Sequence, residues 1–160
     1  GRGKLGEPGK GLVTILIIAS IVLMVLGYRA AVGPVFWGRT PMWVGINNLL
    51  MILAFYFYAA SGAKGAKIWL GTKVRHPQLT GFSIWAFAHL LVNGDLAAIL
   101  LFGGLLAWAV VQVVKIKRLP QTVDRETAPI TSPIVHLAVS LAVVGVVMGL
   151  HYWIGVTPWG

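Results

Sequence analysis

Apolar residues are concentrated in five long runs that are separated by short polar segments. The runs cover residues 11–31, 42–60, 79–92, 96–114 and 133–154. A helix needs roughly 20 apolar residues to cross a hydrocarbon core about 30 Å thick. Four runs meet this requirement, whereas the run at 79–92 is short enough to be re-entrant or interfacial on its own. The pattern predicts an all-α fold, a polytopic transmembrane helical bundle.

Polar and proline residues mark where the predicted helices begin. Pro41 and Pro133 stand at first-turn positions, where the backbone N–H has no intrahelical partner in any case. Ser132 is a favourable N-cap before Pro133. The sequence Asn-Gly-Asp at 93–95 is a turn signal, and Asp95 can cap the helix that follows it.

The composition supports a membrane protein. Hydrophobic residues make up 58% of the 160 residues and charged residues only 11%, against about 45–50% and 25% in soluble domains. This excludes a disordered chain, a nucleic-acid-binding arm and a disulfide-stapled secreted domain, and it makes a water-soluble globule a poor fit. The absence of cysteine excludes thiolate catalysis and cysteine metal ligation.

The basic residues predict the orientation of the bundle. If the five runs cross in alternation, eleven of the 13 Lys and Arg residues fall on one side, in the N-terminal tail and two loops. The positive-inside rule places that side in the cytoplasm and the C-terminus outside it. This distribution requires the run at 79–92 to cross, so we count five spans. The eleven residues are Arg2, Lys4, Lys10, Lys64, Lys67, Lys73, Arg75, Lys115, Lys117, Arg118 and Arg125.

The four histidines are the main candidates for chemistry, because ionisable groups inside a membrane are costly. His76 lies at the cytoplasmic start of the third run, and His89 lies thirteen residues further on, about 20 Å along a helix. His136 and His151 lie near the inner and outer ends of the fifth run. The histidines therefore form two layers, His76 with His136 and His89 with His151. A shared metal must be bridged between helices.

His89 has the strongest case for function, since it lies within an apolar helix, one turn after Trp85 and close to Asn93 and Asp95. A neutral imidazole there could ligate a haem iron or a (bacterio)chlorophyll magnesium, or donate a hydrogen bond to Asp95. Asp95 itself can act as a helix N-cap, as an orienting carboxylate for His89, or as a proton acceptor. Structural interpretations stay open for the other histidines: lipid headgroups for His76, an interhelical hydrogen bond for His136, and the interfacial aromatic belt for His151.

One stretch resembles a known family. Residues 75–81 read R-H-P-Q-L-T-G, residues 85–95 read W-A-F-A-H-L-L-V-N-G-D, and F-G follows at 102–103. This is similar to the signature of the NnrU family, and the resemblance covers essentially the whole chain as a single domain, 1–160. Proteins of this family usually begin with a further transmembrane helix that carries a histidine. The chain starts without Met, so we expect that a sixth span is missing.

The resemblance implies a cofactor. The family includes the 15-cis-zeta-carotene isomerases, which are membrane proteins with haem b, and a bacterial branch named for a link to nitrite and nitric oxide reduction. By resemblance, His89 matches the haem-ligand position and His76 the partner histidine of the R-H-P motif. The depth difference separates His76 from that iron, so the second axial ligand is expected to be His151 or the histidine of the missing helix.

The leading hypothesis is a haem-b-binding protein of the bacterial inner membrane. If it is an enzyme, it is a haem-dependent cis–trans isomerase of an apolar polyene. In that hypothesis His89 ligates the metal, Asp95 and Asn93 orient His89, and Trp85 packs the macrocycle. The alternative is a non-catalytic accessory subunit of a larger respiratory or photosynthetic membrane complex that holds a pigment, either (bacterio)chlorophyll or a carotenoid.

Overall fold

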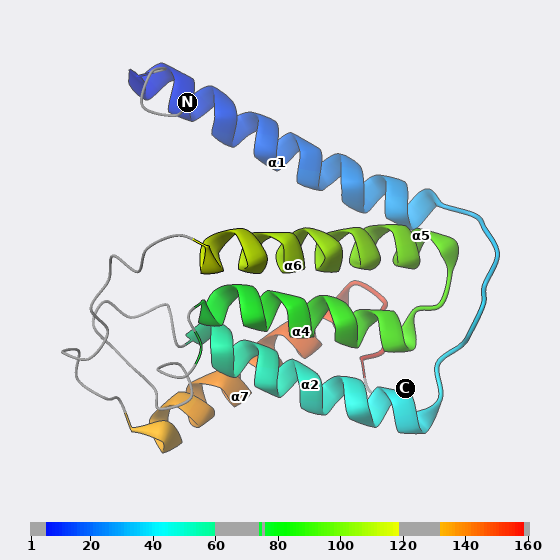
Figure 1. The fold of residues 1–160 in the computed structure, drawn as a ribbon. Coiled ribbons are helices and arrows are strands. Elements are labelled where there is room, and N and C mark those ends of the chain that lie inside the picture. Colours follow the sequence, from blue (N-terminus) through cyan, green and yellow to red (C-terminus); the bar gives the residue numbers. More distant parts are fainter. Residues whose placement is uncertain (1–5, 60–73, 75, 119–131, 159–160) are drawn as a thin grey trace. The chain divides into compact units, whose positions relative to one another are not determined.

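The structure, a computed structural model, describes residues 6–59, 74, 76–118 and 132–158 (Figure 1). The chain divides into two compact units, Gly1–Pro34 and Val35–Gly160. The first unit consists of helix α1, Gly6–Ala30. Its threonine and serine hydroxyls bond inside the helix, since Thr14 Oγ1 donates to the carbonyl oxygen of Lys10 and Ser20 Oγ to that of Ile17. A helix that is apolar on every side and keeps its polar groups to itself is suited to lipid.

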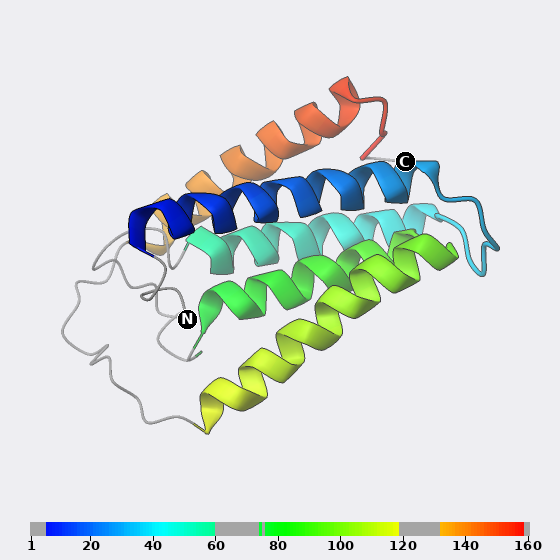
Figure 2. The same cartoon turned by 90° about the horizontal axis from the view of Figure 1, so that it is seen from above.

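The second unit is a layer of antiparallel helices. Figure 2 shows them side by side in the order α6, α4, α2 and α7, so α4 lies between α2 and α6, and α2 separates α4 from α7. Within the described ranges the only β-pairing is one isolated antiparallel bridge, between Val35 and Asp95. The helices are α2 (Pro41–Ala59), α4 (Pro77–Val92), α5 (Leu96–Ala98), the π-helical segment η2 (Ile99–Gly103), α6 (Gly104–Lys117) and α7 (Pro133–Trp153).

The predicted helix starts are confirmed, with one difference in detail. Helix α2 begins at Pro41 and α7 begins at Pro133, so each proline lies in the first turn of its helix. Asp95 caps α5, because its Oδ1 accepts a hydrogen bond of 2.8 Å from the backbone N–H of Ala98. Ser132 occupies the N-cap position of α7, but its side chain makes no capping hydrogen bond. Thr40, which the pattern did not single out, caps α2 through a 3.3 Å bond from the N–H of Trp43.

Small residues allow the central helices to approach closely. A Cβ atom added to Gly81 on α4 would lie 2.6 Å from the carbonyl oxygen of Ala54 on α2, and Ala54 is itself buried. Close approach at small residues is typical of helix pairs in membranes, where van der Waals packing drives association. Gly145 and Gly149, which have the spacing of a helix-packing motif, have no neighbour within 4 Å at their Cβ positions.

Each of the five apolar runs contains a helix, and four helices have the length and apolarity to cross a membrane: Gly9–Ala30, Pro41–Ala59, Leu96–Lys117 and Ile134–Trp153. Helix α4 has 16 residues, a length of about 24 Å, so length alone does not make it a fifth span. Of the basic residues used to orient the bundle, Arg2, Lys4, Lys64, Lys67, Lys73, Arg75 and Arg125 lie outside the described residues.

Candidate functional site

His89 is fixed in the last turn of α4 by a hydrogen bond to its own helix. Its Nδ1 atom lies 2.9 Å from the carbonyl oxygen of Trp85, one turn earlier. A carbonyl oxygen only accepts hydrogen bonds, so in the neutral ring Nδ1 carries the proton and Nε2 keeps its lone pair. The side chain is half-buried. No described residue makes a hydrogen bond to Nε2, which leaves this atom available for a ligand.

His151 repeats the arrangement in the last turn of α7. Its Nδ1 atom lies 2.8 Å from the carbonyl oxygen of Val147, so the same argument leaves Nε2 with a lone pair. Helices α4 and α7 both run antiparallel to α2 and carry His89 and His151 in their last turns. The two histidines that the depth argument placed in one layer therefore lie toward the same end of the bundle.

An aromatic cluster surrounds the His89 ring. The ring lies 4.9 Å from that of Trp85 and 4.8 Å from that of Phe102, measured between centroids. Trp85 also meets Phe102 edge-on at 5.3 Å. Phe82 and Trp108 extend the cluster along α4 and α6. His89 and Trp85 were predicted to be neighbours, and the structure adds the other three rings.

Phe102 reaches His89 from the π-helical segment η2. A π-helical turn changes the register of the helix that contains it, and such turns are frequent at functional sites. Here the segment joins α5 to α6 without a break, so residues 96–117 form one helical run. The apolar pattern predicted a helix at 96–114 but not its π-helical part. The family signature contains Phe102 and Gly103 and could have pointed to Phe102 as a functional residue. It could not have predicted that Phe102 contacts His89.

Asn93 and Asp95 act on the backbone around His89. The backbone N–H and the Nδ2 of Asn93 both donate to the carbonyl oxygen of His89, at 3.0 and 2.8 Å, which closes the end of α4. The carboxylate of Asp95 accepts from Ala98 instead of His89. The hydrogen bond that orients the imidazole is thus supplied by the carbonyl oxygen of Trp85, and Asn93 and Asp95 shape the turn beyond it.

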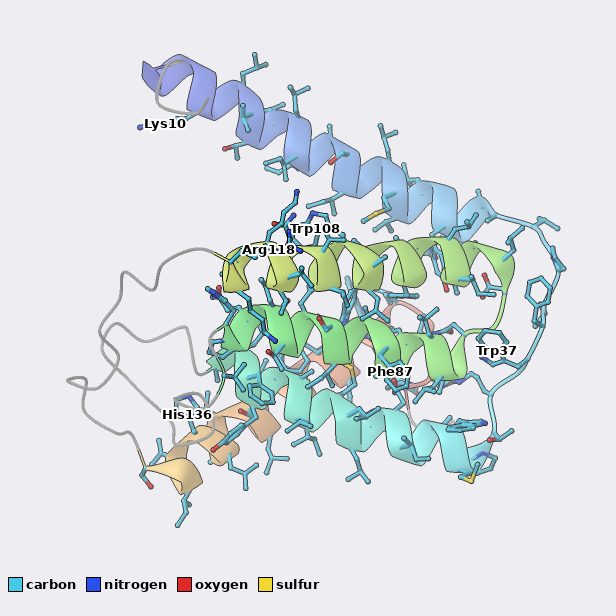
Figure 3. All side chains as sticks on the ribbon, in the orientation of Figure 1. Lys10, Trp37, Phe87, Trp108, Arg118 and His136 are labelled. Atoms are coloured by element: carbon cyan, nitrogen blue, oxygen red, sulfur yellow. The ribbon has the colours of Figure 1, made fainter. Side chains whose placement is uncertain are left out.

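The other two histidines lie away from this pair. His76 is the N-cap residue of α4, at the opposite end of the helix from His89 and about 20 Å from it. His136 is buried, with 7% of its surface exposed, and its ring meets Tyr56 edge-on at 6.0 Å. The Nε2 atom of His136 has no hydrogen-bond partner among the described residues. Figure 3 shows His136 and Trp37 at opposite ends of the second unit.

Metal ligands are sparse in the part of the chain that the structure describes. No group of three or more His, Asp or Glu side chains there could hold a metal ion. His89 and His151 each present an Nε2 with a lone pair, and histidine is a common protein ligand of haem iron. Each of the two imidazoles is therefore in a tautomer that fits a haem ligand.

The fold and the site define an all-helical protein with several helices suited to a membrane and with His89 and His151 in the last turns of two of its helices. A family model described as NnrU protein matches residues 2–158, and the chain therefore belongs to the NnrU family. No curated protein and no solved structure matches the sequence.

Proposed function

We propose that this chain is a haem-b-binding protein of a bacterial inner membrane and that His89 and His151 would hold the haem. The observation that carries the proposal is that the two imidazoles make the same hydrogen bond at Nδ1. Each is held at Nδ1 by a carbonyl oxygen one turn earlier, at 2.9 and 2.8 Å. A hydrogen bond at Nδ1 orients a ligating histidine and raises the basicity of its other nitrogen.

The rest of the site supports the same ligand. Trp85 and Phe102 pack against His89 and supply apolar surface for a macrocycle. His76 lies at the other end of α4 from His89 and is left out of this iron's ligand set. When bound, haem supplies a redox-active iron whose potential depends on the axial ligands and their burial. The chain's own contribution is to hold the two imidazoles and shield them.

The proposal includes five membrane spans. Helix α4 is short for a bilayer, but it packs between two helical runs of spanning length, α2 and the run Leu96–Lys117 that ends in α6. A short span is accommodated by local thinning of the bilayer at modest cost. The distribution of basic residues favours a cytoplasmic location for the ends of the bundle near the start of α4, and an outer location for His89, His151 and the C-terminus.

The family resemblance extends the proposal to cis–trans isomerisation of an apolar polyene. Phe82 and Trp108 meet edge-on at 5.8 Å and continue the aromatic surface away from His89 along α4 and α6. Flat aromatic rings of this kind suit an extended conjugated substrate, which they would hold by dispersion contacts. His89 is the predicted centre of this chemistry, whereas the Asp95 carboxylate is engaged at the start of α5.

Haem binding is tested by spectroscopy of the purified protein. We expect the wild type, produced with adequate haem supply and extracted in mild detergent, to show a reduced-minus-oxidised spectrum of low-spin haem b. His89→Ala abolishes haem retention, and His151→Ala changes the iron to a high-spin form. His136→Ala, a buried histidine away from the pair, is the matched control and keeps the spectrum. A wild type without haem, or an unchanged spectrum in His89→Ala, would overturn the proposal.

The same preparation distinguishes an enzyme from an accessory subunit. Native gel electrophoresis of mildly solubilised membranes is expected to show the chain migrating alone or as a small oligomer, with haem in the same band. Stable comigration with a respiratory or photosynthetic complex would instead assign the accessory role and a pigment-holding function to the two histidines.

A further inference from the structure

A short segment, residues 35–40, crosses the end of the bundle where both paired histidines lie. We call it the strap. It contacts the end of α4 and the turn that follows. Phe36 donates a backbone hydrogen bond of 2.8 Å to the carbonyl oxygen of Gly94, and Val35 forms the isolated bridge with Asp95. Trp37 donates from Nε1 to the carbonyl oxygen of Leu90 at 3.0 Å.

The Trp37 bond satisfies a group that α4 cannot satisfy itself. Leu90 lies in the last turn of the helix, where carbonyl oxygens have no intrahelical partner, and it follows His89 directly. Gly94 makes the contact possible, because a Cβ atom at that position would collide with the ring and the carbonyl oxygen of Trp37. The tryptophan therefore holds the turn that carries His89, and only glycine at position 94 leaves room for it.

The strap also holds the end of α7. Arg39 donates from Nη2 to the carbonyl oxygen of Thr157 at 2.8 Å. Thr157 follows a Schellman turn in which Val156 donates to the carbonyl oxygen of His151 at 2.9 Å and Gly155 adopts a φ of 85°. That turn ends α7 at Trp153, two residues after His151. Arg39 is thus linked to the histidine of α7 through one short, hydrogen-bonded turn.

Helices α4 and α7 have little direct packing of their own. In the described residues α7 packs on α2, and no comparable interface joins α7 to α4. The strap has one hydrogen-bond donor on each side of this gap, Trp37 toward α4 and Arg39 toward α7. The two donors are separated by a single residue, Gly38.

We propose that the strap sets the spacing between His89 and His151, with Trp37 and Arg39 as positioning residues for a two-histidine site. This rests on the proposed function as far as haem is concerned. An iron bound between two imidazoles tolerates little change in their separation, since displacements of about 0.5 Å already degrade a preorganised site. Residues that touch neither the iron nor the imidazoles therefore control the occupancy and the potential of the site.

The first test uses haem as the readout. Trp37→Phe keeps a ring over Gly94 but removes the N–H donor, and Arg39→Met removes the donor of the second contact. We expect each variant to retain haem about three- to tenfold more weakly, the effect of one hydrogen bond, with a shifted midpoint potential and a larger high-spin fraction. Arg39→Lys restores a donor and is expected to recover most of the low-spin spectrum.

The matched control is Trp43→Phe, because Trp43 lies in the first turn of α2 and its indole donates to no described residue. This variant is expected to keep the wild-type affinity, potential and spin state. If Trp43→Phe changed the haem affinity, potential and spin state as much as Trp37→Phe does, the proposal would be overturned. The effect would then not depend on the hydrogen bond from Trp37 to Leu90.

A second test does not depend on haem. The natural chain has no cysteine, so spin labels can be placed at two introduced cysteines, Phe87→Cys on α4 and Leu150→Cys on α7, both at exposed positions. Pulsed electron paramagnetic resonance then gives the distance distribution between the helices. We expect a narrow distribution in the labelled parent, a broader one with Trp37→Phe or Arg39→Met, and no change with Trp43→Phe.

The two readouts separate the possible failures. If the distance distribution between α4 and α7 stayed unchanged in both strap variants, the proposal that the strap sets this spacing would be overturned, whatever the haem content. A wild type that binds no haem overturns the proposed function, and the distance measurement then decides the strap alone.

Discussion

The imidazole of His89 and the phenyl ring of Phe102 lie with their centroids 4.8 Å apart and their planes 31° from parallel. The contact joins the last turn of α4 to a π-helical segment thirteen residues further along the chain. Phe102 is buried, with 7% of its surface exposed, and it also touches Trp85. It therefore packs on the candidate ligand and on the residue whose carbonyl oxygen orients that ligand.

Removal of the Phe102 ring is expected to loosen His89. In lipid there is no hydrophobic driving force between helices, so the cost of Phe102→Ala comes mainly from the cavity, about 2–3 kcal/mol. Thermal unfolding in detergent and the haem spectrum measure it, and we expect a lower Tm and a shifted midpoint potential. Leu100→Ala, an exposed residue of the same segment, is the control. Equal effects of the two substitutions would contradict the packing role of Phe102.

Asp95 offers a test of capping against catalysis. As a cap that accepts from Ala98, Asp95 can be replaced by Asn with little change, whereas Asp95→Ala costs about 1 kcal/mol. We expect the Tm to follow that order and the haem potential to stay constant in Asp95→Asn. If Asp95→Asn shifted the potential or abolished isomerase activity at unchanged Tm, the carboxylate would be an electrostatic or proton-transfer group, and the capping role would be secondary.

Local patterns predicted those parts of the molecule that local physics determines. Hydrophobic runs located the helices, and proline and Asp95 marked where several begin, because first-turn N–H groups need particular neighbours whatever the tertiary fold. The depth of a residue along a straight helix follows from its position in the run. That is why His89 and His151 could be assigned to one layer although α2 separates their helices.

Contacts between distant segments could not be predicted in this way. No local pattern assigns Trp37 a partner, yet its indole donates to Leu90, 53 residues away. The ring contact of Phe102 depends on a π-helical turn, and the apolar pattern of residues 96–114 is the same with or without it. The role of Asp95 as an orienting group for His89 was plausible from proximity in sequence, but the extended backbone of Asn93 directs Asp95 to the next helix.

Gly81 is predicted to control the approach of α2 and α4. A Cβ atom there would lie 2.6 Å from the carbonyl oxygen of Ala54 and 3.2 Å from the Cβ of Phe57, neither of which can move freely. We expect Gly81→Ala to lower stability by about 1–3 kcal/mol, the cost of overpacking. Gly145→Ala has open space at its Cβ and is expected to be neutral or to stabilise the helix by up to about 1 kcal/mol. Paired unfolding measurements compare the two.

A loss of stability in Gly145→Ala would point to a contact that the described residues do not show. It would show that Gly145 packs against something outside the described residues of one chain, and size measurements on the variant would reveal a change of oligomeric state. A neutral Gly81→Ala would contradict the close α2–α4 contact.

The buried Nε2 atom of His136 is expected to lower the stability of the isolated chain. Its ring packs edge-on against Tyr56, but Nε2 is buried without a partner among the described residues, a situation that costs about 1–3 kcal/mol. His136→Phe keeps a ring of similar shape and removes the polar atom, so we expect a higher Tm and an unchanged haem spectrum. His136→Ala also removes the polar atom but leaves a cavity beside Tyr56, and we expect a lower Tm. A destabilising effect of His136→Phe would contradict this and would show that Nε2 binds a water or a ligand. His136 would then mark a buried polar site separate from His89 and His151.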